Sequence, residues 1–166
     1  MNEQDLAVVE RQLGRQPRAV AGIAARCPFG RPAVTEQRPY SATGEPFPTT
    51  YYLTCPHLVA AVARLEAAGG VERFSAGVAA DPALAADLER ATDEQRRVRR
   101  ELAAGEEGAD GGASLELGIG GSRNPGQLKC LHAHVAFALA RPGYALGSAV
   151  LAELDPLWPQ ACCTSL

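Results

Sequence analysis

Strand-type and helix-type segments are separated along this chain, and that separation constrains its fold more than any other feature. Residues 19–26, 32–39 and 48–54 are rich in β-branched, aromatic and other apolar residues, and turns containing proline and glycine divide them. A short amphipathic helix is expected before them at 5–14, and helical spacing of apolar residues dominates from residue 56 onward. This order predicts a single α+β domain, in which a small antiparallel sheet packs against several helices.

The second part of the chain is expected to be mainly helical. A short strand is predicted at 114–119. The acidic, glycine-rich stretch 105–113 is predicted to be a mobile loop, and residues 158–166 a loosely ordered tail. The expected helices run from Pro56 to the Gly69-Gly70 pair and over 71–79, 83–104, 125–141 and 146–154.

Length and composition describe one globular domain. The 166 residues can bury a core without disulfides, and 46% apolar with 21% charged residues is typical of globular proteins. A net charge of −3 gives no reason to expect a nucleic acid or an acidic membrane as partner. No apolar run approaches the ~18 residues of a spanning helix, and Met1 to Asp5 show no secretory signal. We therefore expect a cytoplasmic protein.

The longest expected helix, 83–104, carries a stripe at alternating steps of four and three residues. Its members are Leu84, Leu88, Ala91, Gln95, Val98 and Leu102. Such a stripe faces either the core of its own domain or a partner helix in a homodimer, and the sequence leaves both open. The Arg96-Arg97 and Arg99-Arg100 pairs lie among acidic residues and are interpreted as a solvated, ion-paired face.

Residues 129–134 concentrate reactive side chains: the only lysine, one of five cysteines and two of three histidines. Cys130 and His134 are four residues apart and, at about 100° per residue, project from the same face of the expected helix. By the same arithmetic His132 points toward the core. This stretch is where we expect chemistry.

Cys27 and Cys55 lie at strand ends, where turns allow side chains to converge. Together with Cys130 and a histidine they would form a Cys₃His site, which suits zinc and is compatible with an iron–sulfur cluster. An odd number of cysteines favours thiols or metal ligands over a disulfide framework in a reducing compartment. Plain buried thiols are the alternative. Three interpretations of Cys162-Cys163 are open: extra metal ligands, a redox pair, or part of a frayed tail. We favour the frayed tail.

A glycine-rich run precedes the reactive stretch, and it suggests an anion site at a helix start. Free backbone N–H groups and the positive helix end favour a phosphate or carboxylate there. The residues expected to bind it are Gly120, Gly121, Arg123 and Lys129, with Pro125 at the first helical position. The run lacks the P-loop and dinucleotide patterns, so no nucleotide is implied. A flexible loop before an ordinary capped helix is the alternative.

Three classes of function stay open. The favoured one is a protein with a cysteine and histidine metal site beside the anion site. The alternative is an enzyme acting on a small anionic substrate, with Cys130 as a thiolate whose pKa is lowered by the helix start and Lys129, or with His132 reacting. The third is an interaction module that uses the 83–104 helix.

Five motifs support a family assignment. They are Cys27-Pro28-Phe29-Gly30, Gly44-Glu45-Pro46-Phe47-Pro48-Thr49, Tyr52-Leu53-Thr54-Cys55-Pro56, Gly118-Ile119-Gly120-Gly121 and Lys129-Cys130-Leu131-His132-Ala133-His134. Together they resemble a bacterial family catalogued as domain of unknown function 501, over nearly the whole chain. The resemblance implies no particular activity. It favours His132 beside the three cysteines, whereas helical geometry favours His134, and the fourth ligand stays open.

Overall fold

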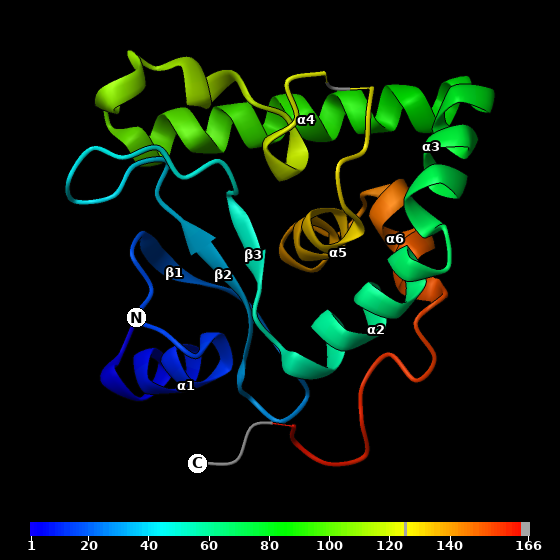
Figure 1. Ribbon diagram of the computed structural model, residues 1–166, viewed down its shortest axis with the longest axis horizontal. Coiled ribbons are helices and arrows are strands. Elements are labelled where there is room, and N and C mark those ends of the chain that lie inside the picture. Colours follow the sequence, from blue (N-terminus) through cyan, green and yellow to red (C-terminus); the bar gives the residue numbers. More distant parts are fainter. Residues whose placement is uncertain (125, 164–166) are drawn as a thin grey trace.

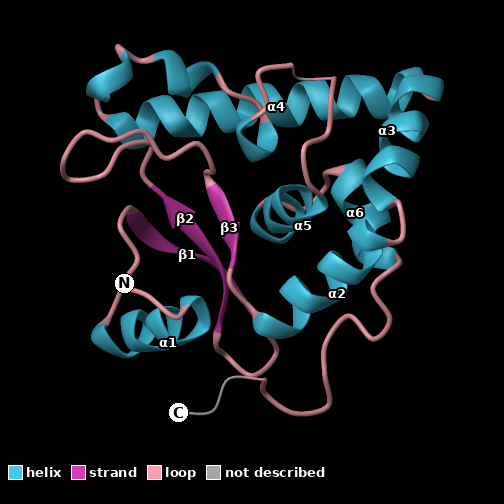
Figure 2. Cartoon of the chain, in the orientation of Figure 1, coloured by secondary structure: helices cyan, strands magenta, loops and turns pink. Residues whose placement is uncertain are grey.

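The computed structural model describes residues 1–124 and 126–163, which form six α-helices and one three-stranded sheet. Figures 1 and 2 show the sheet on one side, with helices covering it and filling the rest of the domain. The helices are α1 (Glu3–Leu13), α2 (Pro56–Ala67), α3 (Gly70–Ala80), α4 (Pro82–Ala103), α5 (Leu131–Ala140) and α6 (Ala145–Ala152). This confirms the predicted α+β class.

The sheet is antiparallel and has the order β1-β2-β3, so consecutive strands are neighbours. Its strands are β1 (Val20–Arg26), β2 (Pro32–Gln37) and β3 (Tyr51–Leu53). Strand β2 is central and almost wholly buried, and its Thr35 pairs with Tyr52 of β3. All three strands lie where the sequence predicts them, although β3 is shorter. Strand β3 is an edge strand, and its outer side faces α5 (Figure 1).

Helix α5 is the centre of the core. Seven of its residues are buried, from Leu131 to Ala138, because apolar side chains surround it on all sides. Figure 1 shows it end-on between β3, α2, α4 and α6. In the described part of the chain no single helix is long and apolar enough to cross a bilayer; α5 and α6 pass that test only together, with a bend of 108° between them.

Helix α4 uses its regular stripe within the domain. Leu88, Ala91, Gln95 and Val98 are all buried in the fold. The stripe therefore packs on the core of its own chain, which is the first of the two alternatives that the spacing left open.

Arg99 corrects the interpretation of the arginine pairs as one solvated face. Its exposed fraction is 0%, and burial lowers the pKa of its guanidinium to about 10. Nε donates to the carbonyl of Ser114 at 3.0 Å, Nη1 to Oγ1 of Thr50 at 3.3 Å, and Nη2 to the carbonyl of Phe47 at 3.0 Å. Arg99 thus connects α4 to the segment before β3, whereas Arg97 is exposed and pairs with Glu101 as expected.

The prediction of a strand at 114–119 was wrong. The segment forms the 3₁₀ turns η2 (Ala113–Glu116) and η3 (Ile119–Gly121) instead. The side chain of Arg96 in α4 donates to the backbone carbonyl oxygen of Glu116, and that of Gln95 donates to the carbonyl oxygen of Leu117. These carbonyl groups therefore do not pair with a strand. The expected loop 105–113 includes a third such turn, η1 (Gly108–Asp110).

The predicted helix 125–141 begins later than expected, at Leu131. Pro125, the expected first helical residue, lies outside the described residues. Cys130 is extended, with φ −158° and ψ 149°, and is the N-cap of α5.

Candidate functional site

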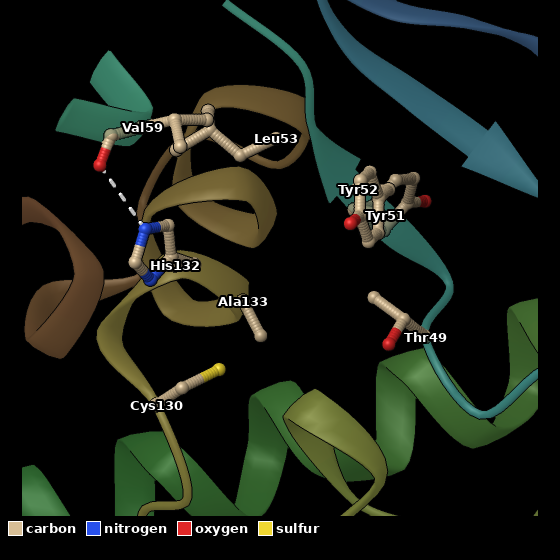
Figure 3. A pocket seen from close by; sticks show the side chains of 8 residues that line it. All are labelled: Thr49, Tyr51, Tyr52, Leu53, Val59, Cys130, His132 and Ala133. Atoms are coloured by element: carbon tan, nitrogen blue, oxygen red, sulfur yellow. Dashed lines mark hydrogen bonds between the residues drawn. The ribbon is translucent and has the colours of Figure 1, made fainter. Parts of the chain in front are cut away.

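A cavity of about 350 Å³ lies between β3, α2 and the start of α5. Its lining comes from three segments that are far apart in the sequence (Figure 3). The lining residues are Thr49, Tyr51, Tyr52, Leu53, Val59, Cys130, His132 and Ala133. The cavity forms beside β3 because β3 is an edge strand, and helix side chains rather than another strand cover its outer side.

The side chains divide the cavity into two walls. Figure 3 shows Cys130 and Ala133 pointing from the α5 side toward Thr49 and the two tyrosines on the other side. Tyr51 is fixed in place because Nε of Arg141 donates to its hydroxyl at 2.8 Å. Most of the lining is apolar or aromatic, and the polar atoms are few.

His132 is held rigidly at this cavity by two acceptors. Its Nδ1 lies 3.1 Å from Oε1 of Glu66, and its Nε2 lies 3.2 Å from the carbonyl oxygen of Val59. A carboxylate and a carbonyl only accept hydrogen bonds, so a ring protonated on both nitrogens donates to both. The orientation of the ring is therefore set by α2.

Glu66 also occupies the start of α5. The backbone N–H of Leu131 donates to the same Oε1 at 2.5 Å. A carboxylate at this position satisfies a free N–H group and complements the positive end of the helix. The helix start that the sequence assigned to an external anion is therefore bound by a carboxylate of the protein itself.

The four residues predicted to bind an anion do not form one cradle around a ligand. Nζ of Lys129 donates to the carbonyl of Gly121 at 2.9 Å, and Arg123 lines a different hollow together with Asp110 and Glu116.

Packing explains the two glycines of the predicted cradle. Gly120 and Gly121 have φ of 70° and 73°, where a side chain is strained. A Cβ on Gly121 would lie 2.9 Å from Cβ of Pro48, and one on Gly120 3.2 Å from Cβ of Ala133. The glycines allow close packing beneath the cavity.

The prediction that Cys130 and His134 share a helix face was wrong. The spacing of 100° per residue applies only inside a helix, and Cys130 is an extended residue before its first turn. Cys130 lines the cavity with His132 instead. Burial raises the pKa of its thiol, although the nearby backbone N–H of Ala133 works in the opposite direction. Burial thus disfavours the thiolate that the enzyme alternative would need at Cys130.

His134 is a core residue. Only 2% of it is exposed, and its Nδ1 lies 2.7 Å from the hydroxyl of Tyr144. Burial lowers the pKa of its imidazole to about 4, so the ring is neutral near pH 7. One ring nitrogen is already engaged with the phenol, and the ring is not directed at the cavity.

The residues predicted to bind zinc are not assembled into one cluster. Cys130 and His132 share the cavity, Cys55 contacts Cys163, and Cys27 is buried at the turn after β1. Over residues 1–124 and 126–163, no three or more histidine, cysteine, aspartate or glutamate side chains are grouped to hold a metal ion. Zinc and the iron–sulfur alternative stay predictions of the sequence.

Sequence reasoning missed Glu66, the residue that organises the site. One signal was present: Glu66 lies in the last turn of α2, where a carboxylate faces the negative end of its own helix. A carboxylate at that position is stabilised when it pairs with a hydrogen-bond donor or a cation outside its own helix. Which partner it has depends on how α2 and α5 pack.

A protein-family model described as "Protein of unknown function (DUF501)" matches residues 23–152. The match includes every residue that lines the cavity, and Glu66 as well. Neither a curated protein nor a solved structure matches the chain.

Proposed function

The chain belongs to the DUF501 family, and we propose from the geometry of its cavity that it binds a small, uncharged, mainly apolar molecule between β3 and the start of α5. The observation that carries this proposal is the fixed His132 ring beside the Cys130 thiol, in a cavity that is otherwise mainly apolar. Binding sites for small molecules combine an apolar lining with a few well-placed polar groups.

The size of the cavity limits the ligand. About 350 Å³ lies near the lower end of the ~300–1,000 Å³ range of ligand pockets. A molecule with about one aromatic ring, or a short branched chain, fits this range. Tyr51 and Tyr52 both line the cavity and give such a molecule aromatic surface to contact.

The charge of the lining argues for an uncharged ligand. Among the described residues that line the cavity there is no lysine, arginine, aspartate or glutamate. A charged ligand would lose its hydration without gaining a counter-charge. The carboxylate of Glu66 lies 3.1 Å from Nδ1 of His132 and would balance the charge of a protonated ring, so this pair is a poor counter-charge for an anionic ligand. The hydroxyl of Thr49 and the thiol of Cys130 suit a ligand with a hydroxyl or carbonyl group.

Preorganisation supports binding at this place. His132 is fixed by two hydrogen bonds and Tyr51 by Arg141, so little side-chain freedom is lost when a ligand enters. The raised pKa of the Cys130 thiol fits a binding role better than nucleophilic catalysis.

Three probes of similar size and different charge test the proposal: benzyl alcohol, benzoate and benzylamine. We expect benzyl alcohol to shift the backbone amide NMR signals of Tyr52, Cys130 and Ala133 at lower concentration than either charged probe. A preference for benzoate would overturn the uncharged ligand and support the anionic one that the sequence suggested.

A matched pair of variants on α2 places the binding in the cavity. Val59 lines the cavity and is half-buried, whereas Ala60 is exposed. We expect Val59→Phe to fill the cavity and remove the effect of benzyl alcohol, and Ala60→Phe to preserve it, with circular dichroism confirming that both variants fold. Undiminished binding by a folded Val59→Phe variant would place the probe elsewhere.

A further inference from the structure

The segment after α6 returns along α2 and ends beside its first turn (Figure 1). We call residues 153–163 the C-terminal strap. Glu153 pairs with Arg73 at 2.6 and 2.7 Å, and Nε2 of His57 lies 3.0 Å from the carbonyl oxygen of Pro156. Trp158 packs against the core. The strap is therefore docked at several points, including one next to Cys55.

At the end of the strap two thiols meet. Sγ of Cys163 lies 3.6 Å from Sγ of Cys55, although the residues are 108 positions apart in the sequence. Both are thiols in the structure. A disulfide has a sulfur–sulfur distance of about 2.05 Å, so the sulfur atoms need to approach by about 1.5 Å. Rotation of the exposed Cys163 side chain is the simplest route to that approach.

We propose that Cys55 and Cys163 are a redox pair that a low-molecular-weight disulfide, such as oxidised glutathione, converts into a disulfide joining the strap to the start of α2. This proposal does not rest on ligand binding in the cavity. The pair differs from the adjacent Cys162-Cys163 redox pair that the sequence offered as one reading of the tail.

The surroundings of the two thiols determine the order of the steps. Cys163 is exposed and meets the oxidant first, whereas only 2% of Cys55 is exposed. The thiolate of Cys163 attacks one sulfur of the small disulfide, forms a mixed disulfide and releases one small thiolate. Cys55 then loses its proton to solvent and attacks the sulfur of Cys163, which releases the second small thiolate. In total two protein thiols are oxidised and one small disulfide is reduced to two thiols.

The environment of Cys55 suits the second of these roles. Only 2% of Cys55 is exposed, so its thiol reacts slowly with an external oxidant. An intramolecular attack on Cys163 needs no diffusion, because the docked strap holds the two sulfur atoms in contact.

The expected consequence is a fastened strap. The disulfide would close a loop across 108 positions of sequence, and long closed loops restrict the unfolded chain strongly. We expect the oxidised protein to melt about 5–10 °C higher than the reduced one. Trp158, the only tryptophan, reports docking of the strap through its fluorescence.

Peptide mapping of the full chain tests the proposal. After treatment with oxidised glutathione and alkylation of the remaining thiols, we expect a linked peptide pair containing Cys55 and Cys163, with Cys162 alkylated. A bond between Cys162 and Cys163, between Cys55 and Cys162, or no disulfide at all would overturn the assignment.

Serine variants provide the matched controls. Cys162→Ser is expected to retain both the linked peptide and the rise in melting temperature, whereas Cys163→Ser is expected to lose both. Cys55→Ser is expected to accumulate glutathione on Cys163. If Cys55→Ser fails to fold, the variant at the exposed position, Cys163→Ser, still tests the proposal. If oxidation raises the melting temperature of Cys163→Ser as much as that of the unsubstituted protein, Cys55 and Cys163 are not the redox pair.

Discussion

The carboxylate of Glu66 lies 3.1 Å from Nδ1 of His132, across 66 positions of sequence. Through this contact the end of α2 holds the start of α5 and orients the one histidine that lines the cavity. A single carboxylate therefore serves both the core helix and the proposed binding site.

Replacement of Glu66 by glutamine tests that double role. The variant keeps the size of the side chain but removes the charge that binds the start of α5 and the ring of His132. We expect a loss of about 1–2 kcal/mol in the free energy of unfolding, measured with urea, because two charge-assisted hydrogen bonds weaken. Glu72→Gln, an exposed carboxylate in the first turn of α3, is the control and should cost under about 0.5 kcal/mol. Equal effects of the two variants would contradict the role of Glu66.

The pH dependence of stability should include a contribution from His134. Its folded-state pKa is about 4, below the ordinary value of 6.5. Between about pH 4 and 6.5, therefore, the imidazole binds a proton in the unfolded state but stays neutral in the folded state. The contribution of the neutral His134 ring to the free energy of unfolding is fully present above about pH 6.5. It is lost as the pH decreases toward 4, by about 2–3 kcal/mol in total. Urea unfolding at several pH values measures this slope. His134→Gln should reduce the slope; an identical slope in this variant and in the unsubstituted protein would disprove the assignment to His134.

Arg99 should be the arginine of α4 that stability depends on most. Arg99→Met leaves the carbonyl groups of Ser114 and Phe47 without their donor, and we expect a cost of about 2–4 kcal/mol in urea unfolding. Arg97→Met, on the exposed face of the same helix, is expected to change stability by less than about 0.5 kcal/mol. A small effect at Arg99 would mean that water replaces its hydrogen bonds.

Metal content tests the zinc site that the sequence suggests. The predicted site requires about one equivalent of zinc in untagged protein, although the described residues group no three such ligands together, and less than about a tenth of an equivalent of zinc or iron would contradict it. EDTA should then lower the melting temperature, because removal of a structural zinc would cost ~10–16 kcal/mol, and an unchanged melting temperature would contradict a structural zinc. A stoichiometric metal would restore the predicted site of Cys27, Cys55, Cys130 and a histidine, and would require these side chains to lie differently in the metal-loaded protein.

Local patterns predicted most of the secondary structure. The helix expected at 83–104 is observed at Pro82–Ala103, and the strand expected at 19–26 at Val20–Arg26. Capping residues and apolar periodicity are properties of neighbouring residues, so they can be read without the fold. The failure at 114–119 has the opposite origin, because side chains of α4 bind the carbonyl groups that a strand would have used.

The candidate site, like the secondary structure, was predicted only in part by the sequence. The sequence by itself determined the α+β class, the DUF501 family and the importance of the stretch that contains Cys130 and His132. Only the tertiary structure decided that His132 rather than His134 lines the cavity, that Glu66 occupies the start of α5, and that Cys55 meets Cys163. The physical reason is that these contacts join segments 65 to 108 positions apart. Spacing along one helix describes directions within that helix, whereas packing between elements decides which side chains share a cavity.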